Sequence, residues 1–138
     1  MNTIHTQTAL KERVQAYHYG CALADYQAVY PDPITIEAGE PLMLSGKEDN
    51  WQGFIWLWCT NQHGKSGWVP QGYVLQTEHG CVARCDYDAI ELNVQTGEAL
   101  LVAQAESSWL WCANQHGKSG WVPADHVRIL SALLMDIY

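Results

Sequence analysis

Basic residues are scarce in this chain. Its 138 residues include 7 lysines and arginines against 15 aspartates and glutamates, which gives a formal net charge of −8. Proteins that bind nucleic acid or anionic membrane surfaces carry clustered lysine and arginine. We therefore expect neither nucleic acid nor a membrane as partner, and the charge fits a basic or neutral partner. Solubility alone is the alternative reason for such a charge.

Long hydrophobic runs are also missing. No stretch reaches the roughly 20 apolar residues that a membrane-spanning helix needs. Residues Met1–Thr8 contain no basic segment followed by an apolar one, as a secretion signal would. These absences predict a cytoplasmic protein. The five cysteines are an odd number in a chain without such a signal, so we expect reduced thiols.

The sequence has little that indicates catalysis. It shows no Ser/His/Asp spacing, no glycine-rich phosphate loop and no carboxylate pair with an obvious shared pocket. His79, Cys81 and Cys85 have a spacing only loosely similar to that of metal ligands, because no Cys-x-x-Cys pair accompanies them. We expect no enzymatic activity, no metal and no cofactor.

What the chain does contain is a long internal repeat. Residues 56–70 read Trp-Leu-Trp-Cys-Thr-Asn-Gln-His-Gly-Lys-Ser-Gly-Trp-Val-Pro, and residues 109–123 repeat them with one difference, Ala113 in place of Thr60. The spacing between the copies is close to the length of the smallest domains that fold alone. The repeat therefore predicts two small domains, and a duplicated Trp-rich unit favours two binding sites over one catalytic centre.

Short strand-like segments separated by turn residues recur in both copies. Pro31 and Pro33 exclude a helix between the first two segments. Residues 46–53 are expected to form a charged loop. Residues 76–80 are expected to link the copies and can span only about 17 Å, which makes the two units near neighbours. This pattern predicts small all-β barrels or sandwiches. The expected strands are 21–26, 34–36, 42–44, 54–59, 66–69 and 74–75, then 82–87, 91–94, 100–102, 109–112, 119–122 and 127–129.

Three motifs, each present twice and in the same order, resemble the Src-homology-3 (SH3) family. Residues 22–26 and 83–87, Ala-Leu-Ala-Asp-Tyr and Ala-Arg-Cys-Asp-Tyr, are similar to the family's ALYDY motif. Residues 34–40 and 91–98 resemble the strand and diverging turn that follow the family's RT loop. Residues 67–74 and 120–127 resemble its G-(Y/W)-(I/V)-P-x-x-Y-V motif. The text is most similar to the variant type found in bacterial proteins.

The resemblance implies a tandem of SH3-like five-stranded barrels. Under this interpretation residues 1–19 are an N-terminal extension, residues 20–76 the first SH3-like domain, residues 81–130 the second, and residues 131–138 a C-terminal tail. It also implies that Asp25 and Asp86 are structural and bond to the backbone. Cys59 and Cys112, which follow Trp-Leu-Trp, are expected to be small buried core residues.

The family resemblance further implies one aromatic groove per domain. Strand alternation places Leu57 and Cys59 on one face and Trp56 and Trp58 on the other, and the family position puts Leu57 and Cys59 in the core. Near each groove the family carries an acidic residue that pairs with a basic ligand residue, here Asp32 or Glu91. The implied sets are Tyr26, Asp32, Trp56, Trp68, Pro70 and Tyr73 for the first groove, and Tyr87, Glu91, Trp109, Trp121, Pro123 and His126 for the second.

Both grooves depart from the family pattern. Ala24 and Cys85 replace a groove tyrosine, and His126 replaces another. We expect a non-enzymatic adaptor that binds a peptide or protein partner, either proline-rich or basic, because preformed polyproline helices suit aromatic grooves. One alternative is a structural module whose aromatic faces are buried between domains or in a homodimer. Another is binding of cell-wall peptides, as in bacterial SH3-type domains.

Overall fold

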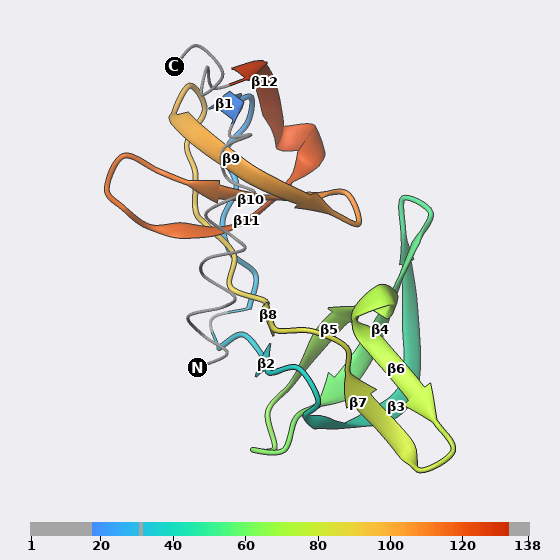
Figure 1. Ribbon diagram of the computed structural model, residues 1–138. Coiled ribbons are helices and arrows are strands. Elements are labelled where there is room, and N and C mark those ends of the chain that lie inside the picture. Colours follow the sequence, from blue (N-terminus) through green and yellow to red (C-terminus); the bar gives the residue numbers. More distant parts are fainter. Residues whose placement is uncertain (1–17, 31, 133–138) are drawn as a thin grey trace. The chain divides into compact units, whose positions relative to one another are not determined.

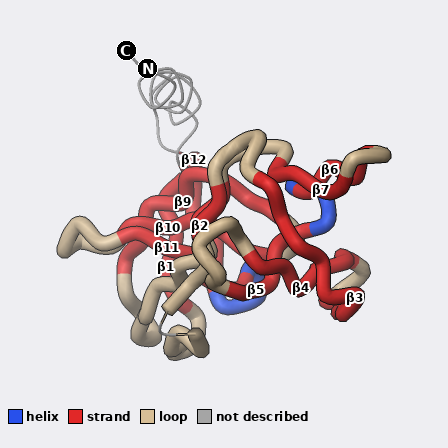
Figure 2. Tube along the Cα trace, turned by 90° about the horizontal axis from the view of Figure 1, so that it is seen from below, coloured by secondary structure: helices blue, strands red, loops and turns tan. Residues whose placement is uncertain are grey.

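The computed structural model describes residues 18–30 and 32–132. Strands dominate this part of the chain, together with two short 3₁₀ helices, η2 (Gln71–Tyr73) and η3 (Ala124–His126) (Figure 2). The all-β prediction is confirmed, and no described helix has the length and apolar character needed to cross a membrane. The strands are β1 (His18–Ala22), β2 (Thr35–Ile36), β3 (Pro41–Trp51), β4 (Phe54–Thr60), β5 (Ser66–Pro70), β6 (Val74–Thr77), β7 (Gly80–Ala83), β8 (Tyr87–Asp88), β9 (Ala99–Glu106), β10 (Trp109–Ala113), β11 (Ser119–Pro123) and β12 (Val127–Ala132) (Figure 1).

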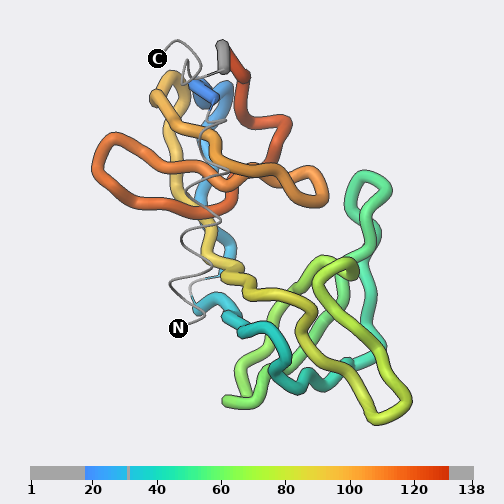
Figure 3. The backbone as a smooth tube through the Cα atoms, viewed as in Figure 1, coloured from blue at the N-terminus to red at the C-terminus, as the bar shows by residue number. Residues whose placement is uncertain are grey.

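The strands form two compact units, each with a five-stranded antiparallel sheet. The continuous unit is residues 28–91, with strand order β5-β4-β3-β7-β6 and the short β2–β8 ladder. The discontinuous unit combines residues 18–27 with 92–132 and has strand order β11-β10-β9-β1-β12. In Figure 3 the blue β1 segment accordingly lies among the orange and red strands of the second copy. The two copies have exchanged their first strands.

This exchange differs from the expectation that residues 20–76 and 81–130 each close their own barrel. Residues 76–80, expected to be a linker, instead belong to a hairpin in which Thr77 faces Gly80 and only Glu78 and His79 form the turn. So short a connection keeps β7 beside β6. The equivalent place between β9 and β12 is taken by β1. The expected extension and tail, residues 1–19 and 131–138, fall almost wholly outside the described residues.

Each unit has its own hydrophobic core, and the two cores are built alike. Leu57 and Cys59 face the core of the continuous unit, as expected, and Leu110 and Cys112 face the other. The exchanged strands contribute Ala83 to the continuous unit and Ala22 to the discontinuous unit, each 2% exposed. The first alanine of each ALYDY-like motif therefore packs in the core of the other copy.

Two further expectations are corrected by the strand register. Residues 46–53 are not a loop, because β3 continues to Trp51 and turns only at Gln52 and Gly53, which have φ of 52° and 88°. Leu44 faces Cys59 but Glu48 faces Leu57, so a three-residue bulge, residues 45–47, lies opposite Trp58. Residues 91–94 do not form the expected strand of that length, and make an isolated bridge between Tyr26 and Val94.

Replacing Gly67 by alanine should destabilise the continuous unit. A Cβ at residue 67 would lie 2.8 Å from Cγ2 of Ile34, a side chain that is only 1% exposed and has no room to move aside. Overpacking of this kind costs about 1–3 kcal/mol, which urea denaturation would measure. Gly72→Ala is the matched control, since nothing lies within 4 Å of its Cβ position. Equal midpoints for the two variants would contradict the packing of Ile34 on Gly67.

Candidate functional site

The outer face of the β4–β5 hairpin carries the aromatic residues of the continuous unit. Since Leu57, Cys59 and Val69 point into the core, alternation puts three cross-strand pairs on the opposite face. These pairs are Trp56 with Pro70, Trp58 with Trp68, and Thr60 with Ser66. The Trp58 and Trp68 rings meet edge to face with centroids 5.1 Å apart. We call this surface the aromatic face of the continuous unit.

Two tyrosines from different copies meet beside this face. Tyr73 ends η2, which directly follows Pro70, and Tyr87 belongs to the β7–β8 segment of the second copy. Their ring centroids are 5.1 Å apart at an angle of 73°, and both rings pack against the core. Edge-to-face pairs of this kind are worth about 0.5–1.5 kcal/mol beyond the area they bury. The tyrosine of the second copy therefore packs with a tyrosine of the first.

The discontinuous unit repeats this arrangement with the roles of the copies reversed. Tyr26, from the first copy, lies edge to face with Trp109 at 5.8 Å and with His126 at 5.6 Å. Trp109 pairs with Pro123 across the strands, as Trp56 does with Pro70. Trp111 and Trp121 form an edge-to-face pair at 5.2 Å, the counterpart of Trp58 and Trp68. His126 thus takes the place that Tyr73 has in the continuous unit.

The structure brings most of the expected groove residues together but divides them differently. Tyr26 does not lie with Trp56, and Tyr87 does not lie with Trp109, because the first strand of each copy closes the other unit. The sequence repeat had assigned each tyrosine to the groove of its own copy. The continuous unit holds Asp32, Trp56, Trp68, Pro70 and Tyr73 together with Tyr87 and Glu91, and the discontinuous unit holds Trp109, Trp121, Pro123 and His126 together with Tyr26.

Several of the expected anchors are buried. Trp56 is 9% exposed and Trp121 6%, and Pro70 and Pro123 are also buried. Trp68, Tyr73 and Tyr87 are half-buried, as are Tyr26, Trp109 and His126. The half-buried rings are therefore the accessible members of the two expected sets.

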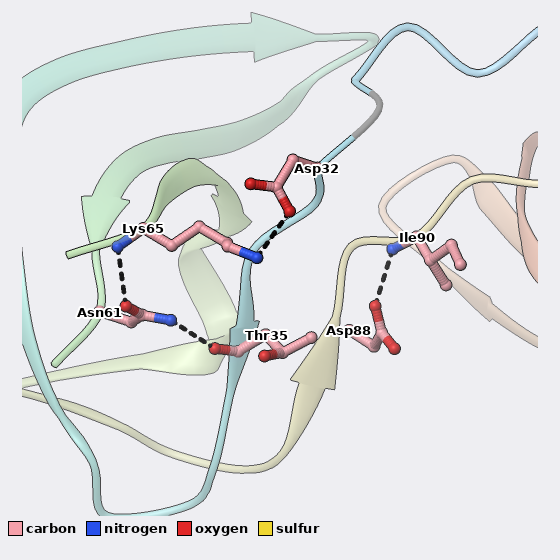
Figure 4. Close-up of polar contacts among 6 residues, drawn as sticks. All are labelled: Asp32, Thr35, Asn61, Lys65, Asp88 and Ile90. Atoms are coloured by element: carbon pink, nitrogen blue, oxygen red, sulfur yellow. Dashed lines mark hydrogen bonds and ion pairs between the residues drawn. The ribbon is translucent and has the colours of Figure 1, made fainter. Parts of the chain in front are cut away.

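Both acidic residues expected in the grooves already bond within the chain. The carboxylate of Asp32 forms an ion pair with the ammonium group of Lys65 at 2.7 Å (Figure 4). Lys65 lies in the turn between β4 and β5, where its backbone amide donates to the side-chain oxygen of Asn61. Asn61 is buried and also donates to the Thr35 carbonyl at 2.9 Å. The Glu91 carboxylate accepts the Val29 amide at 2.9 Å. Asp32 therefore has a cationic partner already, and Glu91 supports the backbone of the loop.

Sequence reasoning missed Lys47, which lies at the aromatic face. Its Nζ is 5.1 Å from the ring centroid of Trp58 and 5.5 Å from that of Trp68. The ring of Tyr30 also lies near Trp58, with the two centroids 6.5 Å apart. The sequence signal was the longer segment before Trp56 in the first copy, because the additional residues include the bulge that carries Lys47.

Asp25 and Asp86 have the structural role that the family resemblance implies. Asp25 accepts the backbone amide of Thr96 at 2.7 Å and its hydroxyl at 2.9 Å, and Asp86 accepts the Ala38 amide at 2.8 Å. The backbone hydrogen bond from Thr96 lowers the pKa of Asp25 below its ordinary value. Each aspartate therefore bonds to the diverging turn of the opposite copy, alongside the exchanged strand.

The two cysteines of the repeat are core residues and poor nucleophiles. Burial raises the pKa of Cys59 to about 11 and that of Cys112 to about 12. The Sγ atoms lie 3.6 Å from the carbonyls of Leu57 and Leu110, to which the thiols donate. Since the thiolate is the reactive form, both side chains are unreactive near neutral pH. Among the described residues, no group of three His, Cys, Asp or Glu side chains is placed to hold a metal.

The family model of the variant SH3 domain matches the chain twice, over residues 19–76 and 80–130. The two matches coincide with the two copies and together cover most of the sequence. No protein with a curated description and no solved structure matches the chain.

Proposed function

Because the chain belongs to the variant SH3 family, we propose that it is a non-catalytic protein that binds an extended peptide segment of a protein partner through two aromatic grooves. Domains of this family are generally protein-interaction modules. The observation that carries the proposal is the meeting of half-buried aromatic rings in each unit, such as Tyr73 and Tyr87. Each groove contains residues of both copies, so neither copy forms its groove without the other.

A proline-containing ligand suits these grooves. A polyproline II helix is preformed and has no internal hydrogen bonds, so little conformational entropy is lost when it docks on aromatic rings. In the continuous unit the Trp56–Pro70 pair forms the floor, and Trp68, Tyr73 and Tyr87 supply half-buried rings. In the discontinuous unit His126 replaces a tyrosine, which reduces the aromatic area. We therefore propose the continuous unit as the stronger site.

A peptide titration with Trp68→Ala tests this proposal. Trp68 is chosen because it is half-buried, whereas Trp56 is 9% exposed and its removal would disturb the fold. Wild type titrated with a library of proline-containing peptides should give saturable NMR shifts at Trp68, Tyr73 and Tyr87. Trp68→Ala should remain folded and lose about ten-fold or more in affinity, as truncation of a central aromatic anchor does.

Leu130→Ala is the matched control for that experiment. Leu130 is an exposed apolar residue on β12 and belongs to the discontinuous unit, so it is not part of the proposed site. Its replacement should leave peptide affinity unchanged. If no peptide shifts these resonances, or if Trp68→Ala splits a dimer without affecting peptides, the aromatic face would be an assembly surface and the binding proposal would fail.

A further inference from the structure

The Trp58–Trp68 pair contacts a cation of this chain, the ammonium group of Lys47. A lysine or arginine placed within about 6 Å of a tryptophan ring is attracted by the negative face of the ring. Lys47 satisfies this condition for both rings at once, at 5.1 and 5.5 Å. The chain therefore places a cation of its own on the surface that would otherwise attract a basic side chain of a ligand.

The backbone of the β3 bulge positions this lysine. Residues 45–47 are additional relative to β4, Gly46 takes a φ of 85°, and the Lys47 amide donates to Ser45 Oγ at 3.0 Å. The discontinuous unit has the same Trp pair but a smaller irregularity in β9, where Gln104 faces Trp111. The lysine that contacts the Trp pair therefore comes from the bulge of β3, which the second copy lacks.

A second lysine of the continuous unit is already paired with an acidic residue. Lys65 forms the ion pair with Asp32, the residue expected to attract a basic ligand residue (Figure 4). Lys65 directly precedes Ser66, whose hydroxyl bonds to Thr60 in the pair next to Trp58 and Trp68. Tyr30, whose ring lies tilted at 6.5 Å from that of Trp58, is two residues from Asp32. Both features suited to a ligand cation are therefore occupied by lysines of this chain.

We propose that Lys47 and Lys65 are internal competitors that make the groove of the continuous unit select peptides with a neutral or acidic residue, and not a basic one, at the Trp58–Trp68 position. This inference rests on the proposed function of peptide binding. A ligand arginine at the Trp pair has to displace Lys47 from the rings, and a ligand arginine directed to Asp32 has to displace Lys65. A neutral residue leaves both contacts intact, and an acidic residue gains the exposed ammonium group of Lys47.

The space around Lys47 is large enough for such a competition. Lys47 and Trp58 both line a hollow of about 460 Å³ with Leu57 and Val74 among its apolar residues and Glu48 and Arg84 among its charged ones. A displaced lysine side chain or an incoming ligand side chain fits in this volume. The local selectivity opposes the overall charge of −8, which by itself favours a basic partner.

The occupancy of the Trp pair is measured first, in the full chain with labelled lysines. Lys47 Hε protons over two indole rings should show an upfield ring-current shift, which Trp68→Ala should reduce. Lys118 is the matched reference. It occupies the place of Lys65 in the second copy, and among the described contacts it bonds only through its backbone, to Asn114. Lys47 signals at the position of Lys118 would overturn the proposal.

Selectivity is then measured with two synthetic peptides that share one Pro-x-x-Pro core and differ by Arg or Gln at a single flanking position. Wild type should bind the Gln peptide at least as tightly as the Arg peptide. Lys47→Ala with Lys65→Ala should shift the ratio of affinities about five- to ten-fold toward the Arg peptide, since a cation–π contact and an exposed ion pair each contribute a few-fold. Lys118→Ala should leave the ratio unchanged.

The outcomes separate this inference from the proposed function. If both peptides bind the continuous unit and the lysine variants do not change their ratio, the competition is absent while peptide binding stands. If wild type prefers the Arg peptide, the lysines likewise do not compete with it, and peptide binding again stands. If neither peptide binds any variant, the proposed function fails and the selectivity fails with it.

Discussion

Removal of residues 1–22 is expected to unfold the discontinuous unit and to leave the continuous unit folded. The deleted segment contains β1, which lies between β9 and β12 and pairs with both. Its loss breaks two ladders and takes Ala22 out of the core. A barrel of this size is only marginally stable, so the loss of a central strand should exceed its whole stability of about 5 kcal/mol.

The seven tryptophan indole signals would report this result by NMR. Trp51, Trp56, Trp58 and Trp68 belong to the continuous unit and should stay dispersed. Trp109, Trp111 and Trp121, in the discontinuous unit, should collapse to positions typical of an unfolded chain. An arrangement with one barrel per copy predicts the reverse pattern, because the deletion would then remove a strand from the barrel of Trp56. The two possibilities therefore give opposite spectra.

A point substitution supports the deletion experiment without shortening the chain. At Gly20 in β1, a Cβ would lie 3.0 Å from Val127 Cγ1 and 3.1 Å from Val102 Cγ2, both in the discontinuous unit. Gly20→Val should therefore loosen the packing of the discontinuous unit, which the indole signals of Trp109, Trp111 and Trp121 would report. If this variant instead lost the dispersed signals of the continuous unit, such as that of Trp56, the strand exchange would be contradicted.

Replacing Tyr87 by alanine is expected to weaken peptide binding at the groove of the first copy. Tyr87 belongs to the second copy, but its ring lies 5.1 Å from Tyr73 and packs against the core of the continuous unit. The loss should be about ten-fold in affinity, which corresponds to about 1.4 kcal/mol. Peptide titration followed by NMR at Tyr73 and Trp68 measures it.

Tyr26→Ala is the matched variant for the other groove, and Tyr87→Phe is the control. Tyr26 contacts Trp109 and His126, so its loss should shift those resonances and leave Tyr73 unchanged. Tyr87→Phe keeps the ring and should retain most of the affinity. If Tyr87→Ala instead shifts Trp109 and His126, each copy builds its own groove and the composite site is wrong.

Much of the fold could be predicted because its signals are local. Strand alternation placed Leu57 and Cys59 on one face, and the family position correctly assigned that face to the core. The family motifs correctly predicted the bonding role of Asp25 and Asp86. Alternation, turn chemistry and motif identity depend on neighbouring residues, so a single sequence carries them fully.

The β3 bulge could not be predicted from local sequence signals. The additional residues before Trp56 were visible in the sequence, and their charges indicated a loop. Register across β3 and β4 decided that most of them continue the strand and that Lys47 reaches the rings of Trp58 and Trp68. A contact between a flexible side chain and rings more than ten residues away leaves no periodic trace in the sequence.

The sequence by itself determined that the chain is a tandem of two SH3-like units. Only the tertiary structure decided which copy supplies each strand. The motifs of the first strands, residues 22–26 and 83–87, are similar enough for either to close either barrel, so local preference does not separate the two pairings. The two-residue turn at Glu78 and His79 decides between the two pairings, because it keeps β7 paired with β6 and leaves β1 to complete the other sheet.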